Sequence, residues 1–319
     1  MHMDIKAARA LIKNIIDNVE KVMVGKREVV ELAVIALLSQ GHLLIEDAPG
    51  VGKTMLARSL ARSIDCTFSR IQFTPDMLPG DITGVSVYNQ KIGDFQFRTG
   101  PIVAQVVLAD EINRATPKVQ SALLEAMEEK QISVDGFTHK MPSPYHVLAT
   151  QNPIEYEGTF PLPEAQLDRF LLRINIGYPS LSDEISVMER QQFVHPIEQI
   201  GHVVNSDDIL ALQETVKRIH INDLIKQYVV SLVDATRHHP SIYLGASPRG
   251  TLALARTGQA RALLQGREYV LPDDIKALAV PALAHRALLS PVGQTLGKES
   301  DTVITEILET VPVPGAVPG

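Results

Sequence analysis

The sequence predicts an α/β protein with a three-layer αβα core on a parallel sheet, followed by an all-helical domain. Up to about residue 178, short apolar runs alternate with amphipathic helical stretches, the pattern of a parallel sheet covered by helices. After residue 182, nearly every stretch has helical spacing instead. We therefore expect a core at residues 1–179 and a helical domain at 180–319, which ends in the Pro/Gly-rich tail VPVPGAVPG.

The core begins with two predicted helices, at 5–20 and after Gly25 as far as about Ser39. HLLIE then predicts a buried strand, and a Gly-rich turn leads into the helix KTMLARSLARSI. A further apolar run, VAQVVLADE, ends in two acids. The helix PKVQSALLEAMEE follows it, with Pro117 suited to the first turn.

More strands complete the core. The stretch QISVDGFTHK predicts a hairpin that turns at Asp135-Gly136, and YHVLAT and FLLRINIGYP predict two further strands. In the helical domain, Pro272 and the two acids after it form a good helix start. The predicted helices of this domain are 182–193, 206–218, 221–239, 247–265, 272–289 and 299–310.

The composition narrows the class of protein. Of 319 residues, 45% are hydrophobic and 21% are charged, which fits a folded chain with a large core. The net charge is 30 − 37 = −7 and Trp is absent, so broad nucleic-acid binding is disfavoured. The lone Cys66 excludes an internal disulfide and fits a reducing compartment. Because no signal-peptide core or membrane-spanning run is evident, we expect a cytoplasmic protein with no membrane span.

A phosphate-binding loop is predicted between HLLIE and the next helix. The stretch DAPGVGKT matches the phosphate-loop pattern except at its first position, where Asp47 replaces Gly. Glycines let backbone N–H groups turn toward phosphate oxygens, and the following helix points its N-terminus at the anion. The Lys reaches the β and γ phosphates, and the Thr hydroxyl reaches Mg²⁺. The predicted nucleotide-binding residues are Pro49, Gly50, Val51, Gly52, Lys53, Thr54 and Met55.

Asp47 is a departure from the pattern. It precedes the tightest part of the loop, so we expect the phosphate cradle to survive. We also expect its charge to lie near the phosphates and to weaken nucleotide binding slightly.

The acids that end VAQVVLADE predict a Mg²⁺ and water site beside the phosphate loop. Mg²⁺ prefers few protein ligands, so one carboxylate is enough to hold its water shell. A second carboxylate can polarise an attacking water. We assign Asp110 to Mg²⁺, together with Thr54, and Glu111 to the water.

Five short sequence blocks, in their order along the chain, resemble the AAA+ ATPases. Their residues are most similar to those of the MoxR branch. The blocks are the phosphate loop, ADEINRA, ATQNP, EAQLDRF and ASPRG. The resemblance covers about residues 10–315, and longer blocks such as TPDMLPGDITG make it specific.

The resemblance implies roles for further residues. Asn152 is similar to the sensor that orients the water or the γ phosphate, and Arg169 in LDRF to the arginine finger that acts on a neighbouring subunit's ATP. Arg173 is an alternative finger but falls inside the next apolar run. In the helical lid, Arg249 in SPRG resembles the second sensor. The segment that lines the adenine is matched by Val24 and Gly25.

The resemblance implies Mg²⁺-dependent ATP hydrolysis by a ring, expected to be a hexamer, that remodels, matures or assembles partner proteins. A von Willebrand A-domain protein is an expected partner, besides a protein client. A chelatase-type motor subunit, a nucleic-acid-stimulated motor and a nucleotide-gated scaffold remain alternatives. Two insertions, at 75–100 and 132–146, are of the kind that faces the pore or the substrate in rings. The second carries one Asp and one Lys, so it is not an evident DNA-reading hairpin.

Overall fold

The computed structural model describes residues 3–152 and 158–314, and a five-stranded parallel sheet forms the centre of the core. The strand order is β2-β5-β8-β1-β9, so the first strand of the sequence lies near the middle. Parallel neighbours place all five carboxyl ends at one edge of the sheet. The strands are β1 (Leu43–Glu46), β2 (Phe68–Gln72), β5 (Val106–Asp110), β8 (His146–Gln151) and β9 (Leu172–Ile174).

Both faces of the sheet are buried, which gives the three layers that the sequence predicts. In β5, Val106 and Leu108 pack with the helices of one face, and Val107 and Ala109 with those of the other. This alternation follows from the two-residue period of a strand. The first face is covered by α1 (Ile5–Glu20), α2 (Arg27–Leu38) and α3 (Lys53–Ser63), and the second by α4 (Pro79–Thr83) and α5 (Pro117–Glu129).

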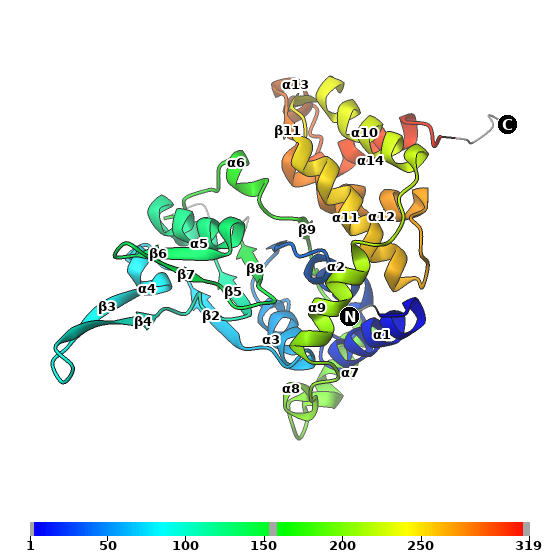
Figure 1. Cartoon of the computed structure of the whole chain (residues 1–319). Coiled ribbons are helices and arrows are strands. Elements are labelled where there is room, and N and C mark those ends of the chain that lie inside the picture. Colours follow the sequence, from blue (N-terminus) through cyan, green and yellow to red (C-terminus); the bar gives the residue numbers. More distant parts are fainter. Residues whose placement is uncertain (1–2, 153–157, 315–319) are drawn as a thin grey trace.

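The first helix lies at the edge of the molecule below the lid helices (Figure 1), where it contacts both the core and the lid. Asp4 caps α1 by accepting a hydrogen bond from the Lys6 backbone N–H at 3.1 Å. Its buried face, from Ala8 through Ile12 to Val19, packs against α2, α3 and the lid helix α11. The connecting segment contains α6 (Glu164–Leu167), α7 (Leu181–Gln191), α8 (Pro196–Gln199) and α9 (Ser206–Val216). The boundary at residue 179 stays a prediction, because α9 packs against α1 and α2 as well as α11.

The lid is helical, as predicted, with one short antiparallel ladder. The predicted helix 272–289 ends early, at Leu283, and the Arg286 side chain that follows bonds to Asp168 of the core. A short 3₁₀ turn and a strand take up the remainder, and that strand pairs with β10. The elements are α10 (Asp223–His238), β10 (Ile242–Leu244), α11 (Pro248–Leu264), α12 (Pro272–Leu283), β11 (Leu288–Leu289), α13 (Pro291–Thr295) and α14 (Ser300–Thr310).

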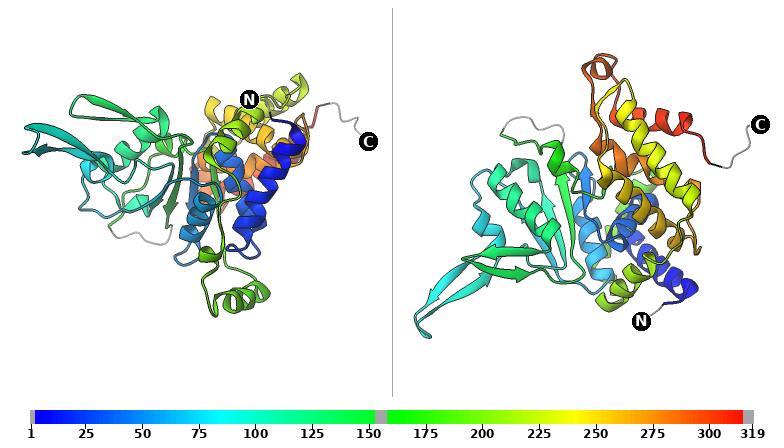
Figure 2. Two further views of the ribbon diagram at one scale, coloured as in Figure 1. Left: turned by 60° about the horizontal axis from the view of Figure 1, so that its bottom comes forward. Right: turned by 45° about the horizontal axis from the view of Figure 1, so that its top comes forward.

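Two antiparallel hairpins project from the core away from the lid (Figures 1 and 2). The longer is β3 (Gly84–Asn89) with β4 (Asp94–Thr99), inside the predicted insertion 75–100. The shorter is β6 (Gln131–Val134) with β7 (Phe137–Lys140), which turns at the predicted Asp135-Gly136. In the described part of the chain, no helix is both long and apolar enough to span a membrane.

Two buried histidines lie where β1 and β8 begin. His42 Nε2 lies 3.0 Å from the Met127 carbonyl, and His146 Nδ1 lies 2.8 Å from the Gly41 carbonyl. Burial lowers the pKa of His42 to about 3 and that of His146 to about 4. Both rings are therefore neutral in the folded protein at neutral pH.

We predict that acid destabilises the fold through these rings. The unfolded chain takes up protons below pH about 6.5 and the buried rings do not, so stability falls as the pH drops from about 6.5 toward 4. Between pH 7.5 and 5, each histidine should cost about 2 kcal/mol of unfolding free energy. Urea unfolding of wild type and His146→Gln at both pH values measures this, and the variant should lose about 2 kcal/mol less. Equal losses in the two proteins would disprove the role of His146.

Candidate functional site

The phosphate loop connects β1 to α3, as predicted. Gly50 and Gly52 have φ angles of 85° and 100°, in the left-handed region that favours glycine. Gly52 is the N-cap of α3, so the backbone N–H groups of the first helical turn face the loop. The Lys53 side chain is largely buried, and its Nζ donates to the Asp47 carbonyl at 2.5 Å.

Asp47 corrects our expectation that its charge faces the phosphates. One carboxylate oxygen accepts from the Ala48 N–H at 2.8 Å, within the loop. The other accepts from the N–H groups of Ile176 and Gly177, at 2.7 and 2.6 Å. The carboxylate is thus bound by backbone donors, two of them in the segment between β9 and α7. Asp47 joins the phosphate loop to the start of the connection toward the lid.

Asp110 and Glu111 follow β5 at the carboxyl edge of the sheet. Asp110 Oδ1 accepts from the Thr150 hydroxyl at 2.6 Å, and its Oδ2 accepts from Arg70 Nη2 at 2.7 Å and Nε at 3.1 Å. Glu111 has a φ of 57°, an uncommon conformation for a side chain of this size. Its Oε2 accepts from Gln72 Nε2 at 2.7 Å, so a polar side chain from β2 orients it.

These residues line one cavity of about 310 Å³. Arg70 and Gln72 were not among the predicted site residues. They alternate along β2, beside the strand that ends in Asp110, and that spacing is a signal that places both side chains on one face at the ligand edge. Val51 does not line the cavity and packs into the core instead. The lining consists of Pro49, Gly50, Gly52, Lys53, Thr54, Met55, Arg70, Gln72, Asp110, Glu111 and Asn152.

Val24 and Gly25 also lie outside the lining of this cavity. They belong to the turn after α1, where the neighbouring Met23 side chain approaches Gly52 of the phosphate loop. Gly25 has a φ of 69°, and a Cβ there would collide with the Asp183 carboxylate of α7. The turn is therefore held between the phosphate loop and α7, and its contact with adenine stays a prediction.

The two predicted arginines lie in a different cavity, of about 450 Å³. Arg169 Nε lies 3.0 Å from Glu128 Oε2, and Arg249 Nη2 pairs with the other oxygen of the same carboxylate. Arg249 lies in the first turn of α11, where a cation is slightly unfavourable, and Glu128 supplies the compensating charge. The alternative finger, Arg173, pairs with Glu46 and Asp301 instead. The sequence did not predict that Arg169 and Arg249 would share Glu128 as a partner.

A buried ion pair fixes the segment that carries Arg169 to the lid. Arg286 Nε donates to Asp168 Oδ1 at 2.8 Å, and its guanidinium also reaches the carbonyls of Phe170 and Leu171. Asp168 Oδ2 accepts from the hydroxyl of Ser247, the residue that caps α11. Burial lowers the pKa of Arg286, and the Asp168 carboxylate opposes that shift. The side chain of Asp168 thereby contacts two separate lid segments.

We predict that Arg286→Met destabilises the lid by about 3 kcal/mol or more, because it leaves a partly buried carboxylate without its cation. Urea unfolding gives the free energy, and hydrogen exchange should show faster opening of residues 168–174. Arg237→Met is the matched control, since Arg237 is exposed. An Arg286 variant no less stable than this control would contradict the prediction.

The residues present fit a Mg²⁺–nucleotide. Two left-handed glycines, a buried lysine and a helix N-terminus converge on one side of the cavity, which suits phosphates. In the described residues, no group of three or more acidic, His or Cys side chains could hold a metal alone. Mg²⁺ held by Thr54, Asp110 and phosphate oxygens requires no such group.

The parallel sheet, the phosphate loop and the helical lid define an AAA ATPase. Residues 42–172 match the ATPase family associated with various cellular activities, and residues 234–307 match the AAA lid domain. The chain belongs to the MoxR family within this class. It is 43% identical to chaperone MoxR1 of Mycobacterium tuberculosis, over 94% of this chain and 82% of that protein.

Two further relatives match the chain nearly end to end. The uncharacterized protein YeaC of Bacillus subtilis is 52% identical over 95% of each chain. A crystal structure of a protein from Cytophaga hutchinsonii superposes with a TM-score of 0.91 at 39% identity, over 97% of this chain and 96% of the other. The fold described above is therefore shared with that crystal structure over nearly all of this chain.

Proposed function

We propose that the protein hydrolyses ATP with Mg²⁺ and uses the cycle to remodel, mature or assemble partner proteins. The observation that carries this proposal is the cavity of about 310 Å³, in which the phosphate loop meets Asp110, Glu111 and Asn152. The phosphate loop binds the phosphates, while Thr54 and Asp110 hold Mg²⁺, which neutralises charge that develops on them. Glu111 polarises the attacking water, and Asn152 orients it. A cytoplasmic location follows as part of the proposal, since ATP is abundant there.

We further propose that Arg169 and Arg249 both act on the ATP of a neighbouring subunit. Their cavity is separate from that of the phosphate loop, and one carboxylate, Glu128, pairs with both. In a ring, expected to be a hexamer, the neighbour's phosphates would replace Glu128 as their partner. Turnover would then depend on assembly.

A protein client is supported by the side chains of the two hairpins. Tyr88, Phe95 and Phe137 are 54, 67 and 71% exposed, and Val85 and Ile92 are also exposed on the longer hairpin. Exposed apolar side chains that cluster on a projecting element mark a binding surface for proteins. A nucleic-acid motor would instead need a basic surface there, whereas 84–99 carries two cations and one acid. A von Willebrand A-domain protein remains the partner we propose from the resemblance.

The test of this function has two parts. In the first, phosphate release measures ATP turnover and particle mass measures assembly, both on the same sample. Assembled protein should show Mg²⁺-dependent turnover that Lys53→Ala abolishes. An assembled ring that never turns over ATP would favour the nucleotide-gated scaffold. Stimulation by DNA with a steep salt dependence would favour the nucleic-acid motor, and Mg²⁺ insertion into a porphyrin by a complex containing this chain would favour the chelatase subunit.

The second part tests the hairpin. Tyr88→Ser with Phe95→Ser should reduce protection of thermally unfolded citrate synthase from aggregation, with ATP turnover unchanged. The matched control is Tyr243→Ser with Phe193→Ser, because those side chains are 76 and 88% exposed elsewhere on the surface. Equal protection by the two double variants would remove the hairpin from the proposal.

A further inference from the structure

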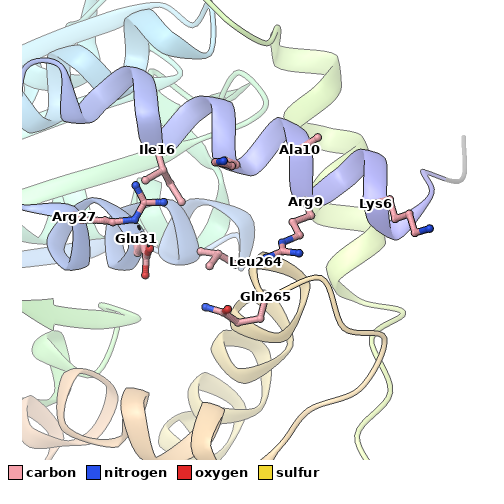
Figure 3. Close-up of a pocket in the computed structure, with 9 residues that line it drawn as sticks. Lys6, Arg9, Ala10, Ile16, Arg27, Glu31, Leu264 and Gln265 are labelled. Atoms are coloured by element: carbon pink, nitrogen blue, oxygen red, sulfur yellow. Dashed lines mark hydrogen bonds and ion pairs between the residues drawn. The ribbon is translucent and has the colours of Figure 1, made fainter.

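A cavity of about 610 Å³ shares no lining residue with the arginine cavity or with the phosphate-loop cavity. It is a groove between α1, α2 and the last turn of the lid helix α11 (Figure 3). Its lining includes four cations and one carboxylate, although the whole chain has a net charge of −7. The groove is therefore a local exception to an acidic surface.

Three of these cations form one stripe along α1. Lys6, Arg9 and Lys13 are spaced three and four residues apart, which places them on one face of a helix. All three are exposed, and among the described residues none bonds or pairs with their charged side-chain ends; the only side chain that reaches one of the three is Asp4, which accepts from the Lys6 backbone N–H. The fourth cation, Arg27, is different, because Asp17, Glu20 and Glu31 surround it. The uncompensated charge belongs to the α1 stripe.

The groove also has apolar lining, from the lid and from α1. Leu264 faces the groove from the end of α11, and Ile16 lines it from α1 (Figure 3). The stem of Arg9 packs against Gly266, just after that helix. Arg249 lies at the opposite end of α11, about 22 Å from Leu264 at the rise of 1.5 Å per residue. A ligand in the groove would contact the core helix α1 and the lid helix α11 together.

We propose that this groove binds an acidic, extended segment of a partner protein. The stripe from Lys6 to Lys13 is about 10 Å long, and acids at alternate positions of an extended peptide recur about every 6.6 Å. A segment with two or three such acids matches the stripe in length and in charge. Leu264 offers a place for one apolar side chain of the same segment. This site adds a partner surface to the proposed ATPase and does not depend on turnover.

A nucleic acid fits the groove less well than a peptide. No aromatic side chain lines it, so bases have no stacking surface. Three uncompensated cations also make a short track for a phosphate backbone. The experiment below includes an oligonucleotide so that this occupant is tested directly.

The test is fluorescence anisotropy of a labelled peptide with Glu at alternate positions, added to the full-length protein without ATP. Binding should weaken steeply with salt, and the Gln counterpart of the peptide should not bind. Lys6→Glu with Lys13→Glu should weaken binding at least about tenfold, since each change replaces an attraction with a repulsion. Arg9 is left in place because its stem packs against Gly266.

The matched control is Lys226→Glu with Lys276→Glu, which alters the net charge equally at two exposed lysines of the lid. Circular dichroism and basal ATP turnover should be unchanged in both double variants. Equal affinity for the Glu peptide in the two would overturn the proposal. The proposal would also be overturned if a labelled oligothymidylate bound more tightly than the peptide and its binding weakened only in the Lys6→Glu, Lys13→Glu variant. Because the assay contains no ATP, a protein without ATPase activity could still bind the peptide.

Discussion

Arg169→Ala is expected to bind ATP as wild type does and to hydrolyse it about 10³–10⁵-fold more slowly. Such a factor corresponds to roughly 4–7 kcal/mol of transition-state stabilisation. Affinity should survive because Arg169 lies in the cavity of Glu128, apart from the phosphate loop that would bind the nucleotide. Phosphate release measures turnover, and equilibrium binding of a fluorescent ATP analogue measures affinity.

Mixing tests whether Arg169 acts across a subunit boundary. In a ring formed from equal amounts of Arg169→Ala and Lys53→Ala, about a quarter of the interfaces join an intact phosphate loop to an intact finger. Turnover should therefore recover to about that fraction of the wild-type rate. Assembled mixtures without recovery would show that the arginine does not act in trans. A large loss in Arg173→Ala but not in Arg169→Ala would transfer the role to the alternative arginine.

Glu111→Gln is expected to bind ATP and to slow hydrolysis by about 10²–10⁴-fold, the usual contribution of a general base. The amide keeps the size of the side chain but cannot accept a proton from water. Gln72 and Arg114, which both bond to Oε2, hold the side chain at the edge of the cavity. Single-turnover phosphate release separates this chemical step from binding.

The stalled variant should also retain its client, because the ATP-bound state would persist. A pull-down with Glu111→Gln and ATP would then enrich proteins that wild type releases. Glu129→Gln is the control, since Glu129 is an exposed acid at the end of α5. Unchanged turnover in Glu111→Gln would remove this carboxylate from the mechanism and leave Asp110 as the remaining acid at the cavity.

The local sequence pattern predicted the helices and strands of the core well, because the formation of each element depends mainly on residues close to it in the sequence. The helix at 117–129 matches α5, and the strand–loop–helix unit around DAPGVGKT has the predicted form. The predicted helix 272–289 was wrong at its end, where the bonds from Arg286 to a distant core segment compete with helical pattern. Nothing in the sequence near Arg286 indicates that its partner is Asp168.

The site was predictable where its residues adjoin strands and less so where distant segments meet. Asp110 and Glu111 could be placed from one apolar run, since parallel strands bring their carboxyl ends to one edge. The shared partner of Arg169 and Arg249 required the position of the lid against α5, which depends on packing among many residues. The roles of these side chains in turnover stay predictions.

The carboxylate of Asp47 has a consequence for how nucleotide binding and lid position are related. It bonds at once to the phosphate loop and to Ile176 and Gly177, so the conformations of those two segments are not independent. Suppose that nucleotide binding shifts the equilibrium of that connection toward one arrangement by some factor. Thermodynamic reciprocity then requires that this arrangement raises nucleotide affinity by the same factor. A glycine at this position would have no side chain through which to transmit that coupling free energy.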